Sequence, residues 1–148
     1  MVATLTEARD DINTRFQTDW NSLSSAAAGY TPEIRWEGTE IGSLPDASLA
    51  WARVSIKHTQ SNQMSLGSPG TRRFERWGYV TVQIFTPLSR GQGLSLSEQL
   101  ATIARNAFEG QTTPKAVWFR RVTVKEIGID GPWENVNVIA AFCYDEIR

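Results

Sequence analysis

The clearest pattern in the chain is an alternation of apolar and polar positions along residues 77–85. Side chains two residues apart in a strand point to the same side, so this alternation predicts a long β-strand. One side is apolar throughout and consists of Gly78, Val80, Val82 and Ile84. The other side mixes aromatic and polar residues, namely Trp77, Tyr79, Thr81, Gln83 and Phe85. We expect the apolar side to meet a core and the other side to face water or a partner.

A first helix is predicted near the N-terminus, where apolar residues recur at three- and four-residue steps. These residues are Leu5, Ala8, Ile12, Phe16 and Trp20. The helix should span residues 4–20, with Thr4 and Glu7 forming a capping box at its start. Residues 21–29 are small and polar, so we expect a loop there.

A second helix is predicted over residues 96–109 by an apolar face with the same spacing. Ser95 and Glu98 have the spacing of another capping box, and Gly110 stands where a left-handed residue ends a helix. The preceding Gly91-Gln92-Gly93 turn resembles part of a phosphate-binding loop. It lacks the third glycine and the P-loop lysine, so an ordinary strand-to-helix turn is the better interpretation.

Four other segments are predicted as strands, and one of them has mixed faces that indicate a bulge or a twist out of the sheet. The four cover residues 33–38, 49–58, 116–129 (the mixed strand) and 134–145. The order of elements is then α-β-β-β-α-β-β. This order predicts a single α+β domain, residues 1–148, with a mostly antiparallel sheet of about five strands and two helices packed on one face.

A polar segment, residues 59–71, connects two of the long strands. It has too little apolar surface to bury, so we expect a long mobile β-hairpin loop that projects as an arm. Loops of this length in a compact domain are usually functional or disordered. Met64 and Leu66 are apolar positions in this segment, and the basic cluster Arg72, Arg73 and Arg76 follows it.

The overall charge gives no sign of a nucleic-acid partner, because 15 basic and 16 acidic residues leave a net charge of −1. Acidic residues gather in the first helix, whereas Arg72, Arg73 and Arg76 precede the central strand. This unevenness fits docking between copies of the chain, and it equally fits solvated faces. The arginines and Trp77 could bind nucleic acid by charge and stacking. Glu75 lies within the cluster and reduces its positive charge, so we expect no specific binding. Six tryptophans are many for 148 residues, and tryptophan is enriched at contact surfaces.

Reactive side chains are few, and we expect no catalytic residue, cofactor or metal ion. His58 is the only histidine and Cys143 the only cysteine. A zinc site needs about four ligands, and a cysteine–histidine pair would require these two residues to meet in the fold. We expect an exposed polar role for His58. No apolar stretch is long enough to span a membrane, and the N-terminus lacks the features of a signal peptide or anchor.

Several strand and turn patterns resemble phage tail terminator proteins of long-tailed phages, the family of the minor tail protein U type. The resemblance begins with the run from Gly78 to Pro87 followed by Gly91-Gln92-Gly93 and spans nearly the whole chain. It continues through Phe108-Glu109-Gly110, Val117-Trp118-Phe119, Asp130-Gly131-Pro132-Trp133 and Phe142-Cys143-Tyr144-Asp145. The N-terminal helix followed by a Tyr-x-Pro turn fits the same family.

The resemblance implies a structural virion protein that is not an enzyme. Members of the family form a ring, usually a hexamer, on the head-proximal end of the tail tube. The ring stops tube polymerisation and offers a surface to head-completion proteins. The implied partners are copies of the chain itself, the tail tube protein and a head-completion or connector protein. The protein would lie in the virion tail, and in the host cytoplasm during assembly, with a free monomer as one option before assembly.

On this hypothesis, residues of the arm and of the outward strand faces make the contacts with other subunits or with the tube. The expected contact residues are Met64, Leu66, Arg72, Arg73, Arg76, Trp51, Trp77 and Tyr79. Two alternatives stay open. One is a head–tail connector or another minor tail protein, and the other is a small ligand-binding domain or enzyme with a pocket under the sheet.

Overall fold

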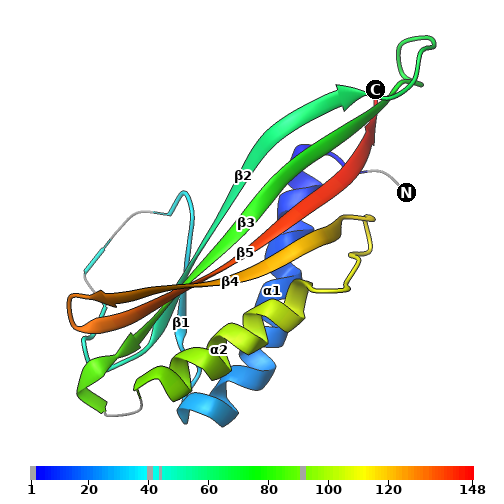
Figure 1. Cartoon of the computed structure of the whole chain (residues 1–148). Coiled ribbons are helices and arrows are strands. Elements are labelled where there is room, and N and C mark those ends of the chain that lie inside the picture. Colours follow the sequence, from blue (N-terminus) through cyan, green and yellow to red (C-terminus); the bar gives the residue numbers. More distant parts are fainter. Residues whose placement is uncertain (1–2, 40–41, 44, 91–92) are drawn as a thin grey trace.

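The computed structural model describes residues 3–39, 42–43, 45–90 and 93–148 (Figure 1). These residues form an α+β fold in the predicted order α-β-β-β-α-β-β, which confirms the fold class. Its elements are α1 (Leu5–Ala28), β1 (Glu33–Trp36), β2 (Trp51–Gln63), β3 (Arg73–Pro87), η1 (Leu88–Arg90), α2 (Gly93–Phe108), β4 (Trp118–Asp130) and β5 (Trp133–Ile147).

The five strands form one mixed sheet with the order β1-β2-β3-β5-β4, so the strand with the clearest alternation, β3, lies at its centre. Three of the four strand pairs are antiparallel, and only β1 runs parallel to its neighbour β2. β3 pairs with β5 along its whole length, from Arg73 opposite Ile147 to Pro87 opposite Trp133. The predicted irregularity of β4 is confirmed, since its register shifts twice against β5.

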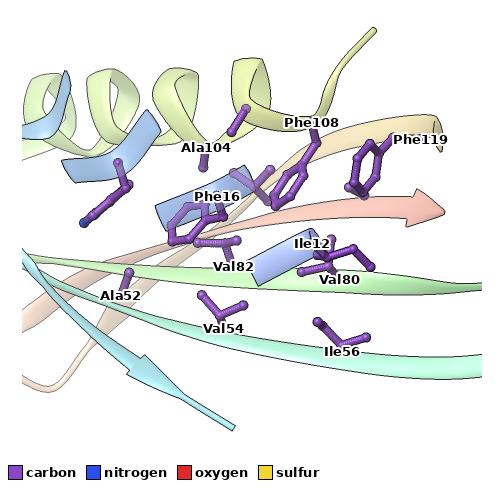
Figure 2. Packing of buried hydrophobic residues seen from close by; sticks show 14 of the residues in the cluster. Ile12, Phe16, Ala52, Val54, Ile56, Val80, Val82, Ala104, Phe108 and Phe119 are labelled. Atoms are coloured by element: carbon purple, nitrogen blue, oxygen red, sulfur yellow. The ribbon is translucent and has the colours of Figure 1, made fainter. Parts of the chain in front are cut away.

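Both helices pack on one face of the sheet, where the inward strand residues form the core (Figure 2). Val80, Val82 and Ile84 of β3 are fully buried, as their alternation predicts. Between the helices, Phe16 of α1 stacks on Phe108 of α2 with ring centroids 6.0 Å apart. A core of this composition stabilises the fold mainly by removing apolar surface from water.

The first helix is longer than predicted, because α1 continues through Ala28 and ends at Gly29 in the left-handed conformation, with φ 83°. The predicted loop over residues 21–29 is therefore wrong. The side chain of Ser24 is buried, and its hydroxyl donates to the carbonyl of Trp20 at 2.6 Å, so a polar residue continues the buried stripe. At the other end, the capping box of Thr4 and Glu7 is confirmed.

The start of the second helix also differs from the prediction. α2 begins at Gly93, so Ser95 lies inside the first turn and the predicted capping box of Ser95 and Glu98 is wrong. The Ser95 hydroxyl instead accepts a hydrogen bond from the Gln99 side chain at 3.1 Å. Gly110 follows the helix with φ 72°, which confirms its predicted role. Residues 91 and 92 of the Gly91-Gln92-Gly93 turn lie outside the described residues.

In the projecting hairpin, the two strands are longer and the loop that connects them is shorter than the sequence predicts. β2 continues to Gln63 and β3 already begins at Arg73, so only residues 64–72 connect the strands. We call residues 60–77 the arm and residues 64–72 the arm tip. The arm extends beyond the helices at one end of the molecule, beside the C-terminal end of β5 (Figure 1).

Candidate assembly surfaces

The arm tip is a folded loop that presents two apolar side chains. Met64 is 49% exposed and Leu66 is 92% exposed. The loop is closed by a backbone hydrogen bond from Met64 to Arg73 at 2.8 Å, and the amide of Arg73 donates to the Ser65 hydroxyl at 2.9 Å. Both predicted tip residues therefore stand on a defined local conformation, and their contact role stays a prediction.

The three arginines of the predicted basic cluster are separated by the strand geometry. We call the sheet face away from the helices the outer face. Arg73 points to this outer face and bonds Asp145 at 2.9 Å, whereas Arg76 points to the helix side and bonds Glu146 at 2.7 Å. Arg72 pairs through its backbone with the last residue, Arg148. These bonds tie the arm to the end of β5, so Arg73 and Arg76 serve the arm's own structure.

The outer face of the sheet carries a packed aromatic cluster near β1. Trp51 of β2 stacks on Phe85 of β3 with centroids 4.2 Å apart, and Trp133 of β5 meets both rings edge-on. Arg53 lies over Trp51 at 5.4 Å, and Arg35 lies over the same ring at 5.5 Å. Trp51 is consequently only 6% exposed, and its contact role stays a prediction.

A second aromatic cluster lies on the same face toward the arm. Arg120 stands between two tryptophans, 4.5 Å from the ring of Trp77 and 5.1 Å from that of Trp118. Both tryptophans flank Cys143 on β5, because each pairs with it across the sheet. Tyr79 is nearby in β3 and is 40% exposed. Arginine–aromatic pairs of this kind offer flat, amphipathic surface suited to a protein partner.

Sequence reasoning found Trp51, Trp77 and Tyr79 but missed the residues that complete the two clusters. The missed residues are Phe85, Trp133, Arg35 and Arg53 in the first cluster, and Trp118 and Arg120 in the second. The positions of Phe85, Arg35 and Arg53 depend on the pairing of β2 with β3 and with β1, and those of Trp133, Trp118 and Arg120 on the pairing of β5 with β3 and β4. The chain order alone gives neither. The available signal was that several of these residues occupy outward positions in alternating strands.

His58 and Cys143 do not meet. His58 lies on the helix side, half-buried, with its Nε2 atom 2.7 Å from the Tyr144 hydroxyl and its ring against Phe142. The expectation of an exposed His58 is therefore wrong. Burial, Arg9 and Arg76 lower the pKa of His58. Cys143 lies on the outer face, where burial raises its pKa to about 12 and leaves the thiol protonated and unreactive at neutral pH.

The part of the chain that the structure describes gathers no group of three or more histidine, cysteine, aspartate or glutamate side chains suited to a metal ion. None of its helices combines the length and the apolar character needed to cross a membrane. An open groove of about 530 Å³ lies between α1 and α2, away from the sheet. Leu23, Ala26, Ala27 and Ile103 are its apolar lining, and Glu98 is its charged residue.

Comparisons with known proteins add a likeness of fold. No family model and no curated protein matches the chain. One solved structure superposes with a TM-score of 0.63 at 18% identity, covering 92% of this chain and 94% of the other. At this identity the likeness shows a shared fold alone. A chain from the virion of a native gene transfer agent particle gives a TM-score of 0.49 at 10% identity, covering 94% of this chain and 93% of the other, which is too loose to bear on function.

Proposed function

We propose that the protein is a structural tail protein of a phage or prophage that caps the head-proximal end of the tail tube as a ring. The ring stops tube polymerisation and forms the surface for head joining. The resemblance of strand and turn patterns along nearly the whole chain supports this assignment. The structural observation that carries it is a sheet with helices on one face only, an aromatic outer face and a projecting arm.

A closed ring needs two different surfaces on each subunit, because each copy contacts its neighbours head to tail. The chain offers such surfaces at separate places: the arm tip, the outer sheet face and the groove between the helices. Four of the six tryptophans lie on the outer face, with arginines packed over the rings of Trp51, Trp77 and Trp118, and both residue types are enriched among the residues that contribute most to protein–protein binding. We therefore expect the partners to be other copies of the chain, the tail tube protein and a head-completion protein, with no reaction catalysed.

Electron microscopy of particles made without the protein tests this function. A terminator that is missing should leave overlong tails that carry no heads, because nothing stops the tube. Complementation with the wild-type gene should restore tails of one length joined to heads. Free tails of normal length would overturn the terminator function and would instead indicate a head–tail connector. Normal particles would exclude both roles.

A further inference from the structure

Leu66 is the most exposed large apolar residue of the described chain, at 92%. Its loop is held in shape, since the Thr71 amide and hydroxyl both bond to the Ser68 carbonyl and Arg72 bonds to the Gly67 carbonyl at 2.8 Å. A leucine on a preformed loop loses little conformational freedom when it is buried by a partner. The arm tip is thus an apolar projection that is ready to enter a complementary groove.

The groove between α1 and α2 offers such a site at the opposite end of the molecule. The chain just before α1 is fixed beside the arm, because the Ala3 amide donates to the Asp145 carbonyl at 3.0 Å. α1 runs away from the arm, and at 1.5 Å per residue the groove residues Leu23 and Ala26 lie about 27 and 32 Å along the helix from its first residue, Leu5. Figure 1 shows the arm tip and the far end of α1 at opposite ends, so the arm cannot enter its own groove.

Charge agrees with this pairing. The only charged residue that lines the groove is Glu98, which makes no ion pair among the described residues. The charged residue closest to Leu66 along the chain is Arg72, which likewise makes no described ion pair. A cation beside the projection and an anion beside the groove favour one orientation of docking.

We infer that the arm tip of one copy docks into the groove between α1 and α2 of the next copy, with Leu66 against the apolar lining and Arg72 near Glu98. This inference rests on the proposed ring and names the subunit contact that would build it. The two surfaces differ and lie at opposite ends of the folded molecule, so repeating the contact produces a head-to-tail series of copies. The series closes into a ring when the rotation from one copy to the next permits it.

Disulfide trapping between copies tests the contact. One preparation carries Ser68→Cys, which leaves Leu66 in place, and a second, tagged preparation carries Ala26→Cys in the groove. A matched control replaces Ala26→Cys by Asn21→Cys, which is exposed on the same helix but does not line the groove. The native Cys143 is buried and contributes no background. After mixing and oxidation with oxidised glutathione, cross-linked pairs are counted on a non-reducing gel.

We expect at least about tenfold more cross-linked product for Ser68→Cys with Ala26→Cys than for the control pair, since docking raises the effective concentration of the two thiols and the disulfide then retains the pair. Adding Leu66→Glu should abolish the excess. Arg72→Glu should reduce it, and Glu98→Arg in the other preparation should restore it. Equal yields for groove and control pairs would overturn the inference, as would an excess that Leu66→Glu leaves unchanged.

The proposed function and this contact can fail separately. Overlong, headless tails in the deletion phage together with equal trapping yields would keep the terminator function and reject the arm-in-groove contact. Specific trapping together with normal particles in the deletion phage would keep the contact and reject the terminator function.

Discussion

The two faces of the sheet use the same strands in different ways. On the helix side, Val80, Val82 and Ile84 lie fully buried beneath α1 and α2. On the outer side, Trp51 and Phe85 are nearly as buried, but only because neighbouring aromatic and arginine side chains pack over them. The helices α1 and α2 thus cover one face of the sheet, whereas only the side chains of the sheet's own strands cover the other.

Unpaired polar atoms occur on both sides of the sheet but are more numerous on the outer one. Five shielded side-chain atoms there have no hydrogen-bond partner in the described chain: the indole nitrogens of Trp51 and Trp77, the amide oxygens of Asn135 and Asn137, and Nε of Arg35. The helices carry two such atoms, Oδ1 of Asn13 and Oγ of Ser97. Buried polar groups are nearly always paired in native proteins. The helices therefore bury most of the core, and the outer side keeps more unpaired polar groups that are available to a partner. Substitutions on the two faces should therefore separate stability from assembly.

The largest effect on stability is expected in the core. Phe16→Ala should lower the free energy of unfolding by about 3–5 kcal/mol, because it removes a ring stacked on Phe108 and packed against Trp20. Urea denaturation measures the change. The matched outer-face substitution Tyr79→Ala should cost less than about 1 kcal/mol, since that side chain is 40% exposed. Equal costs at the two positions would contradict the comparison.

A smaller effect on stability is expected at Gly78, whose backbone lies close to β2 and to the Phe142 ring. A methyl group added at Gly78 would lie 2.3 Å from the Lys57 carbonyl oxygen and 2.6 Å from the Phe142 ring. Gly78→Ala should therefore destabilise the fold by about 1–3 kcal/mol, measured in the same urea titration. Gly42→Ala is the control, because nothing lies within 4 Å of the added group there. A neutral Gly78→Ala would show that β2 and Phe142 can move aside.

Charge reversal on the arm should affect assembly more than folding. Arg72→Glu with Arg73→Glu removes the half-exposed Arg73–Asp145 ion pair, and exposed ion pairs contribute little to stability. Circular dichroism should show a folded monomer, whereas assembly measured by light scattering should weaken. A double variant that melts below the working temperature would instead mean that the two arginines hold the fold.

The smallest expected effect is a pH dependence of the free energy of unfolding, caused by His58 on the helix side. Burial and two nearby arginines hold the pKa of His58 below its ordinary value of 6.5. Between that lowered pKa and 6.5 the unfolded chain binds more protons, so the free energy of unfolding should fall as the pH drops through this window. Carboxylates with lowered pKa, such as Glu37, act at lower pH.

Denaturation at pH 7 and at about pH 5.5 measures this dependence. Replacing the imidazole by a side chain that does not titrate, as in His58→Gln, should flatten it. A dependence of unchanged size in His58→Gln would assign it to other groups.

Local alternation was enough to predict most of the fold, including the buried side of β3 and a final strand over residues 134–145. It failed where pairing overrides local preference. Residues 60–63 are polar and were expected in a loop, but they form strand because Gln60 and Gln63 pair with Trp77 and Phe74 across the ribbon. Similarly, α1 continues past Trp20 because Ala27 and Ala28 pack against the core, and the buried Ser24 is tolerated because its hydroxyl donates to the Trp20 carbonyl.

The candidate surfaces were only partly predictable for a related reason. Outward tryptophans could be identified from alternation, and so could the apolar residues of the arm. The partners that complete each cluster could not, because Arg120 reaches Trp77 only through the register of β4 against β5 and of β5 against β3. The groove could not be predicted from the sequence either, since it depends on how α1 and α2 pack against each other.

The most direct test of the proposed capping role is light scattering during polymerisation of purified tail tube protein, with the present protein added in increasing amounts. A ring that caps tube ends should halt growth well below one copy per tube subunit, because only the ends need to be occupied. Tube growth that continues unchanged at equimolar protein would contradict the account.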